Sequence, residues 1–187
     1  MQSSTIEPVS QAVSINTAKV SGRRKVRFAT LDEILADAER LATGPIRPLG
    51  NWSFGQCTGH LARAMSMSLD GIEGGRAPWV IRMFLRVLKH RLLTKGLRPG
   101  FNLRSPFADQ MIPDGAHSTD EGLNELRNHI ARLKRETQRH PHPAFGPLTR
   151  EEWDQLHMRH AELHLSFFVP AQDLCSGIPE NSARQLS

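Results

Sequence analysis

Three histidines close together near the end of the sequence point most directly to chemistry. They are His157, His160 and His164, in the string His157-Met-Arg-His160-Ala-Glu-Leu-His164. Because an α-helix turns by about 100° per residue, the three imidazoles would fall within roughly 60° of one another on one helix face. His160 and His164 also have the i, i+4 spacing that places two side chains one above the other. This spacing suits joint binding of a metal ion.

The surrounding residues predict that this histidine face points inward. The apolar residues on the same side are Trp153, Leu156, Leu163 and Phe167, and the other side carries Glu151, Glu152, Gln155, Arg159 and Glu162. Imidazoles on a buried face lose hydration, so each needs a partner. Two explanations stay open: a bound metal ion, or core histidines that hydrogen-bond to backbone carbonyls or buried water. A metal site would need a third ligand from elsewhere in the chain.

Length and composition indicate an ordinary soluble domain. The chain has 187 residues, of which 39% are hydrophobic and 23% charged, and this is enough for one domain with a proper core. Cys57 and Cys175 are too few for a disulfide framework. We find neither an apolar run of signal-peptide length at the N-terminus nor a segment of about 20 apolar residues. We therefore expect a cytoplasmic protein.

The net charge of +5 raises the question of an anionic partner. Arg82, Arg86 and Lys89 share one face of an expected helix, and the opposite face carries Ile81, Phe84, Leu85, Leu88 and Leu92. There is no zinc-finger spacing and no helix-turn-helix signal beside these residues. We expect a solvated basic face rather than binding to nucleic acid or a membrane.

Helix-start signals recur along the chain without strand-type alternation. Capping boxes are expected at Thr30–Glu33, Ser53–Gln56 and Thr149–Glu152, and Pro78 suits the first residue of a helix. The expected helices cover about 30–43, 53–70, 78–95, 119–139 and 149–170, with Pro170 closing the last. The fold class is therefore all-α, with bundle-like packing and no sheet.

The expected domain organisation follows from the same pattern. Residues 1–26 are expected to be a disordered tail, 27–170 the helical bundle, and 171–187 a disordered or loosely packed tail. Residues 96–118 contain several prolines and glycines, so we expect a crossover segment there.

The third ligand candidate is His60, in the string Trp52-x3-Gln56-x3-His60. Taken alone, His60 is better explained as a partly exposed histidine at the edge of an apolar arc. On the same helix, Asp70 and Cys57 are explained by a solvated helix end and a small buried residue. Gln56 is expected to be the capping-box partner of Ser53.

Two motifs together resemble the DinB/YfiT-like superfamily of metal-binding four-helix bundles. One is the Trp-x3-Gln-x3-His string at the start of a helix, and the other is His-x3-His near the end of the last helix. The segment from His142 to Trp153 (HPAFGPLTREEW), followed by Leu156-His157 through His164, resembles an uncharacterised branch of this superfamily. The resemblance covers roughly residues 27–170. The chain departs from that branch at Leu163, where relatives often carry a second, adjacent histidine.

The resemblance implies an up-down four-helix bundle with an additional short N-terminal or crossover helix. It also implies a metal site formed by His60, His160 and His164. His157 and Gln56 would orient these ligands without binding the metal themselves. Zinc is the expected ion, with nickel, iron or manganese as alternatives. Three neutral imidazoles would leave coordination positions open.

Members of this superfamily include thiol-dependent transferases and isomerases, which use low-molecular-weight thiols, and metal-dependent hydrolases. We therefore expect an enzyme in which a divalent ion, held by the three histidines, activates a thiol or water for transfer or hydrolysis on a small molecule. The alternative is a non-catalytic metal-binding or interaction protein whose basic helix meets an anionic partner. A purely structural metal is a further alternative, and a homodimer is a reasonable expectation for such a bundle.

Overall fold

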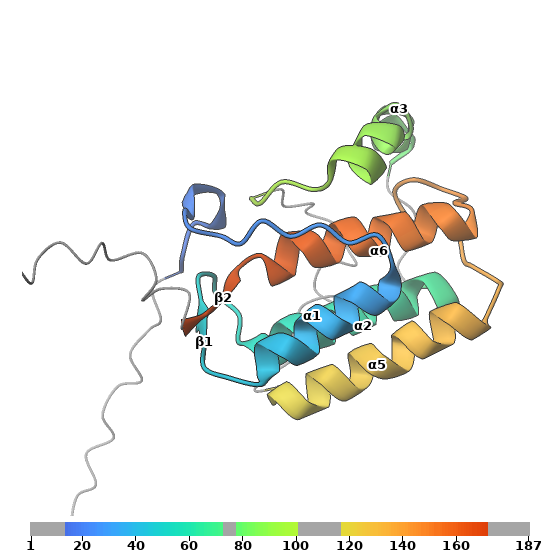
Figure 1. Cartoon of the computed structure of the whole chain (residues 1–187). Helices are drawn as coiled ribbons and strands as arrows, with labels where there is room; N and C mark the ends of the chain where they lie inside the picture. The colour runs from blue at the N-terminus through green and yellow to red at the C-terminus, as the bar shows by residue number, and fades with distance from the viewer. Residues whose placement is uncertain (1–13, 73–77, 101–116, 172–187) are drawn as a thin grey trace, which may run out of the picture.

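The computed structural model describes residues 14–72, 78–100 and 117–171, and this part of the chain is predominantly helical (Figure 1). In chain order its elements are the 3-10 helix η1 (Thr17–Lys19), α1 (Leu31–Ala42), β1 (Ile46–Pro48), α2 (Phe54–Asp70), α3 (Trp79–Lys95), α5 (Thr119–Arg135), α6 (Arg150–Leu165) and β2 (Phe168–Pro170). The helical class is confirmed. Most of the expected crossover segment, the first half of the expected N-terminal tail and nearly all of the expected C-terminal tail lie outside the described residues.

Side-chain caps explain where the helices begin. The expected capping boxes at Ser53 and Thr149 are both present, each with its N3 partner bonded back to the cap. A further capping box at Ser118 precedes α5, which begins at Thr119 as expected. The Thr30 hydroxyl accepts the Glu33 N–H.

Two helices end earlier than the sequence analysis predicted. Helix α5 stops at Arg135 rather than near residue 139, and α6 stops at Leu165 rather than running to Pro170. Residues before a proline are biased toward extended backbone, and aromatic and β-branched residues favour strands. Both preferences apply to the segment Phe168–Pro170, which forms β2 instead of a last helical turn.

The sequence analysis predicted no sheet, and this was wrong, because the structure contains a two-stranded sheet. Strand β2 pairs antiparallel with β1, with Ile46 opposite Pro170 and Pro48 opposite Phe168. Each strand has three residues, too few for an alternating pattern to be visible in the sequence. The pairing joins the chain before α2 to the chain after α6, so it holds the start of one histidine-bearing helix close to the end of the other.

Four of the helices pack on one another in pairs (Figure 1). Helix α2 packs against α5 and α6, and α1 packs against the same two helices. The apolar residues of these helices, such as Ile34, Leu61, Leu126 and Leu165, form one buried core. Helix α3 instead lies against α6, on the side away from α1 and α5.

The closest helix contact is between α2 and α5, and it depends on glycine. A Cβ atom on Gly122 would lie 2.1 Å from Thr58 Oγ1 and 2.5 Å from the Gly55 carbonyl oxygen. A Cβ on Gly55 would in turn lie 2.2 Å from the backbone oxygen of His117. Small residues thus let the backbones of α2 and α5 approach, and this approach fixes the position of α2.

The N-terminal segment before α1 is attached to α6 by polar contacts. Arg159 and Glu162 were expected on the polar side of α6, but both are buried, at 4% and 9% exposure. Glu162 Oε1 accepts the Phe28 N–H at 2.7 Å, and Arg159 Nη2 donates to the Phe28 carbonyl at 2.6 Å. The face of α6 opposite the core is therefore covered by residues earlier in the chain.

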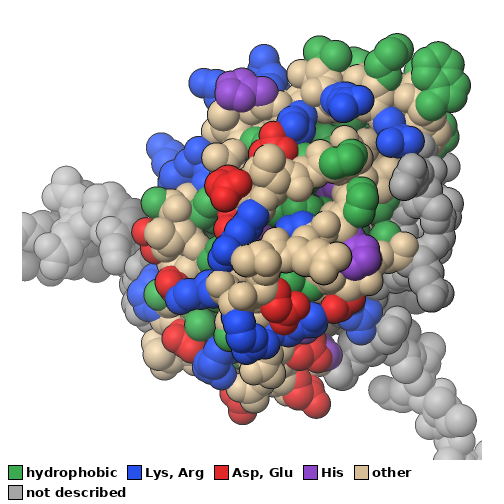
Figure 2. Space-filling view, turned by 90° about the vertical axis from the view of Figure 1, so that its right-hand side faces the viewer, with side chains coloured by type: hydrophobic (Ala, Val, Ile, Leu, Met, Phe, Trp, Pro, Cys, Tyr) green, Lys and Arg blue, Asp and Glu red, His purple; other side chains and the backbone are tan. Residues whose placement is uncertain are grey.

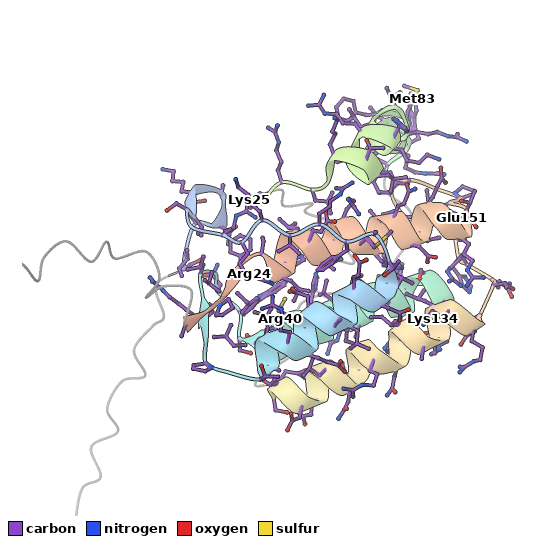
Figure 3. All side chains as sticks on the ribbon, in the orientation of Figure 1. Arg24, Lys25, Arg40, Met83, Lys134 and Glu151 are labelled. Atoms are coloured by element: carbon purple, nitrogen blue, oxygen red, sulfur yellow. The ribbon has the colours of Figure 1, made fainter. Side chains whose placement is uncertain are left out.

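Arg24, four residues before Phe28, also anchors this N-terminal segment (Figure 3). Its guanidinium donates to both carboxylate oxygens of Asp37, at 2.9 and 2.6 Å, and to the Phe168 carbonyl at 2.7 Å. The sequence analysis placed Arg24 in the N-terminal tail. Bidentate arginine–carboxylate pairs are among the stronger polar contacts in proteins, so this one ties the segment to α1 and β2 together.

Replacing Gly122 by alanine tests the close α2–α5 contact. Alanine stabilises a helix relative to glycine by up to about 1 kcal/mol. At this position, however, its methyl group would overlap the Thr58 hydroxyl and the Gly55 carbonyl. We expect overpacking to prevail and the free energy of unfolding to fall by about 1–3 kcal/mol in urea denaturation. Asn128→Ala, at an exposed position of the same helix, should change it by less than about 0.5 kcal/mol. A Gly122→Ala protein as stable as the parent would contradict the contact.

Candidate metal centre

Three imidazoles from two helices meet at one point. His60 comes from α2, and His160 and His164 come from α6. The Nε2 atom of His160 lies 3.1 Å from that of His60 and 2.9 Å from that of His164. One ring nitrogen from each of the three histidines lies within 4.8 Å of the others. The structure therefore brings together the three residues that the sequence analysis selected, and such a group could bind a metal ion.

These separations suit a shared ion better than hydrogen bonds. A neutral Nε2 carries either one proton or one lone pair, so His160 Nε2 cannot make good linear bonds to two other nitrogens at once. Two nitrogens bound tetrahedrally to zinc at about 2.05 Å lie about 3.3 Å apart. Both short contacts of His160 are close to that value. A single divalent ion would satisfy all three lone pairs together.

Burial keeps two of these rings neutral. The pKa values of His160 and His164 lie well below the usual 6.5, chiefly because burial disfavours the charged ring. The neighbouring imidazoles add to the shift, since positive charge on one ring opposes charge on the next. Both rings are therefore neutral at pH 7, which is the form that binds metals.

Trp52 forms one wall of the cluster. Its indole stacks on the His164 ring, with centroids 5.3 Å apart and planes 13° from parallel, and its centroid lies 4.7 Å from that of His60. The sequence analysis quoted Trp52 as part of a motif but gave it no role. Its place one residue before a helix cap was the only available signal. Trp52 restricts the orientation of two candidate ligands from two different helices.

A cavity of about 700 Å³ adjoins the three histidines. Its lining is mostly apolar and includes Trp52, Met67, Leu85, Leu156, Leu163 and Phe167. Its walls come from α2, α6, α3 and the segment before α2, so it lies where several elements meet. A pocket of this size holds a small organic molecule, and few polar groups compete with the imidazoles for it.

His157 and Gln56 were expected to support the ligands. The Ser68 hydroxyl donates to the Met65 carbonyl at 2.7 Å, so its oxygen is left to accept the His157 Nε2–H at 3.0 Å. This bond joins α6 to α2 one turn away from the cluster. Gln56 Oε1 accepts the Ser53 N–H at 2.9 Å, as its capping-box role requires. Both residues hold the helices that carry the three histidines.

Asp70 and Cys57 have the structural roles expected for them. Asp70 pairs with Arg132 on α5, and this pairing is the main reason that its pKa falls to about 2. Cys57 is buried at 1% exposure, and burial raises the pKa of its thiol. The thiol is therefore protonated and apolar in its behaviour at neutral pH.

His142 lines the cavity, although the sequence analysis named it only as the first residue of the segment that carries the family resemblance. Its Nδ1 accepts the backbone N–H groups of Ala144 and Phe145 at 3.0 and 3.2 Å, so the neutral ring carries its proton on Nε2. The ring packs against Phe145 and Trp153, and burial lowers its pKa to about 4. His142 thus gives the cavity wall a neutral hydrogen-bond donor.

Residues 20–171 match the family described as DUF1569, protein of unknown function. The matched segment covers most of the chain. The chain belongs to the DUF1569 family. Searches of curated proteins and of solved structures give no significant match. Among the described residues, none of the helices combines the length and apolar character needed to cross a membrane.

The buried histidines predict an acid-sensitive fold in the metal-free protein. Burial is the main cause that lowers the pKa of His157 from 6.5 to about 3, whereas the unfolded chain keeps the ordinary value. As pH falls below 6.5, the unfolded state therefore takes up protons that the folded state does not. The free energy of unfolding should fall with pH, by up to about 1.4 kcal/mol per pH unit for each such histidine.

His157→Leu tests the assignment of this effect. Urea denaturation between pH 4 and pH 7 should show a shallower dependence on pH than in the parent, because one buried site no longer titrates. His90→Leu, which replaces an exposed histidine of α3, is the control for the loss of an imidazole. Equal slopes for His157→Leu and the parent would show that His157 is not buried as described.

Proposed function

We propose that this protein is a metal-dependent enzyme that uses His60, His160 and His164 to hold one divalent ion. The observation that carries the proposal is the convergence of three ring nitrogens within 4.8 Å beside an apolar cavity. A solvated or purely packing role for these rings would not need one nitrogen of each to converge on the same point. The donor set, three neutral imidazoles, favours zinc, with nickel, iron or manganese as alternatives.

The number of ligands favours a reactive site over a structural one. Structural zinc sites are closed by four protein ligands, whereas three ligands leave a position for a small molecule. An ion held there lowers the pKa of water or of a thiol that binds at that position. The chain itself then supplies a water-poor cavity, a stack of Trp52 on His164 that limits ligand movement, and the His142 N–H as a donor.

We also propose that the fold is a DinB-like four-helix bundle formed by α1, α2, α5 and α6, with α3 as the additional helix. The pairwise packing of those four helices supports this, as does the origin of the ligands from α2 and α6. On this proposal, the nucleophile is a low-molecular-weight thiol or water, and the reaction is transfer or hydrolysis on a small molecule.

Metal content of the untagged protein tests the proposal. We expect close to one equivalent of metal by elemental mass spectrometry, and a loss of most of it in His160→Ala and His164→Ala. His90→Ala, at an exposed position of α3, is the matched control and should keep the parent stoichiometry. Circular dichroism would verify that each variant stays folded.

Two results would contradict the proposal. One is a parent protein without metal even after incubation with zinc, nickel, iron and manganese. The other is full metal content in both folded histidine variants, which would place the ion elsewhere.

Spectroscopy of the cobalt-loaded protein would separate the two nucleophiles. Addition of a small thiol should produce a thiolate-to-metal charge-transfer band if thiols occupy the open position. Absence of that band, with hydrolysis of an activated ester that depends on His164, would favour water.

A further inference from the structure

The outer face of α3 exposes large apolar side chains. The exposed fractions are 72% for Trp79, 58% for Met83, 64% for Phe84 and 80% for Val87, and Val80 lies beside them at 54%. Figure 2 shows apolar side chains at this edge of the molecule, with basic side chains around them. The sequence analysis placed Phe84 on the apolar face of this helix, opposite Arg82, Arg86 and Lys89. Single exposed apolar residues are common, but several adjacent ones on one helix are not.

The inner face of α3 already has its partner. Leu85 and Leu93 are buried, and the Lys89 ammonium pairs with the Glu152 carboxylate of α6. Helix α3 therefore rests on α6 by one face, and Met83 points to the other side (Figure 3). The outer apolar residues occupy positions 79, 80, 83, 84 and 87, which form one stripe on a helix with 3.6 residues per turn.

The charge on this face has one sign. Helix α3 contains no acidic residue, and the second half of its outer face carries Arg86, His90, Arg91 and Lys95, all exposed. Within the described part of the chain, no carboxylate pairs with Arg86 or Arg91. The outer face thus has an apolar half that ends at Val87 and a basic half that begins beside it.

We propose that the outer face of α3 docks on an anionic lipid surface. Helices that lie in the membrane interface combine bulky apolar side chains, which enter the acyl boundary, with lysine and arginine that meet the lipid phosphates. Trp79 and Phe84 are suited to the first role and Arg86 and Arg91 to the second.

The alternative partners fit less well. A second copy of this helix would bring only more positive charge to the interface, because α3 has no carboxylate to offer. A nucleic acid would neutralise the arginines but would leave Trp79, Met83 and Val87 without an apolar partner. The combination of an apolar stripe and unpaired cations favours a surface that is both apolar and anionic.

Vesicle flotation with the full chain tests the proposal. We expect binding to phosphatidylcholine vesicles that contain phosphatidylglycerol, and little binding to pure phosphatidylcholine. Phe84→Ser with Val87→Ser should lower the partition coefficient about tenfold or more, because two buried apolar side chains are lost. Both positions are largely exposed in the free protein, so these variants should remain folded.

Charge-reversal variants test whether vesicle binding depends on the basic residues of α3 or only on the net charge of the protein. Arg86→Glu with Arg91→Glu should also lower partitioning about tenfold. Arg127→Glu with Arg135→Glu, on α5, changes the net charge by the same amount at exposed positions away from α3 and should have a much smaller effect. Quenching of tryptophan fluorescence by brominated lipid should depend on Trp79 and be lost in Trp79→Phe.

Three outcomes would overturn the proposal. The first is no binding to anionic vesicles at low salt. The second is a dimer, seen by analytical ultracentrifugation, that Phe84→Ser with Val87→Ser dissociates while vesicles do not bind. The third is binding to duplex DNA with no binding to vesicles. None of these readouts uses metal content, so the lipid proposal and the metal proposal succeed or fail separately.

Discussion

The three imidazole nitrogens beside the cavity impose the main physical constraint on this fold. Neutral rings at this spacing have no complete hydrogen-bonding pattern among themselves, because His160 Nε2 faces two other nitrogens. Lost hydration and mutual repulsion on protonation both oppose burying them. A shared divalent ion would remove the conflict, since it would take one lone pair from each ring. The rest of the structure holds α2 and α6 close enough for that to occur.

Several independent contacts fix that spacing. The close α2–α5 approach at Gly122 positions α2, and the His157–Ser68 hydrogen bond joins α6 directly to α2. The β1–β2 pair closes the end of the assembly near His164. On the opposite face of α6, Arg159 and Glu162 bind the backbone of Phe28 and hold the N-terminal segment in place. Changes well away from the histidines should therefore alter the geometry of the centre.

Local signals made much of this predictable. Capping boxes at Ser53 and Thr149 marked two helix starts, and the expected helix over 119–139 corresponds to α5. The i, i+4 histidines pointed inward as expected. The family resemblance added His60 as the third candidate ligand. The residues around His60 in the sequence did not by themselves identify it as one.

What could not be predicted depends on contacts between distant parts of the chain. Arg159 and Glu162 look like surface residues of α6 until the Phe28 segment covers them, and three-residue strands leave no pattern. The amphipathic pattern of α3 placed Phe84 on the apolar face, whereas the helix packs on α6 through Leu85 and Leu93 and turns Phe84 outward. Periodicity gives the faces of a helix, and the neighbouring helices decide which face is buried.

X-ray absorption spectroscopy of the zinc-loaded protein would test the central claim most directly. Its fine structure reports the number, type and distance of the ligand atoms around the ion. The account predicts three imidazole nitrogens at about 2.0–2.1 Å, together with one or two oxygen ligands from solvent. A shell with one imidazole or none, or one dominated by sulfur or carboxylate oxygen, would contradict a site formed by His60, His160 and His164.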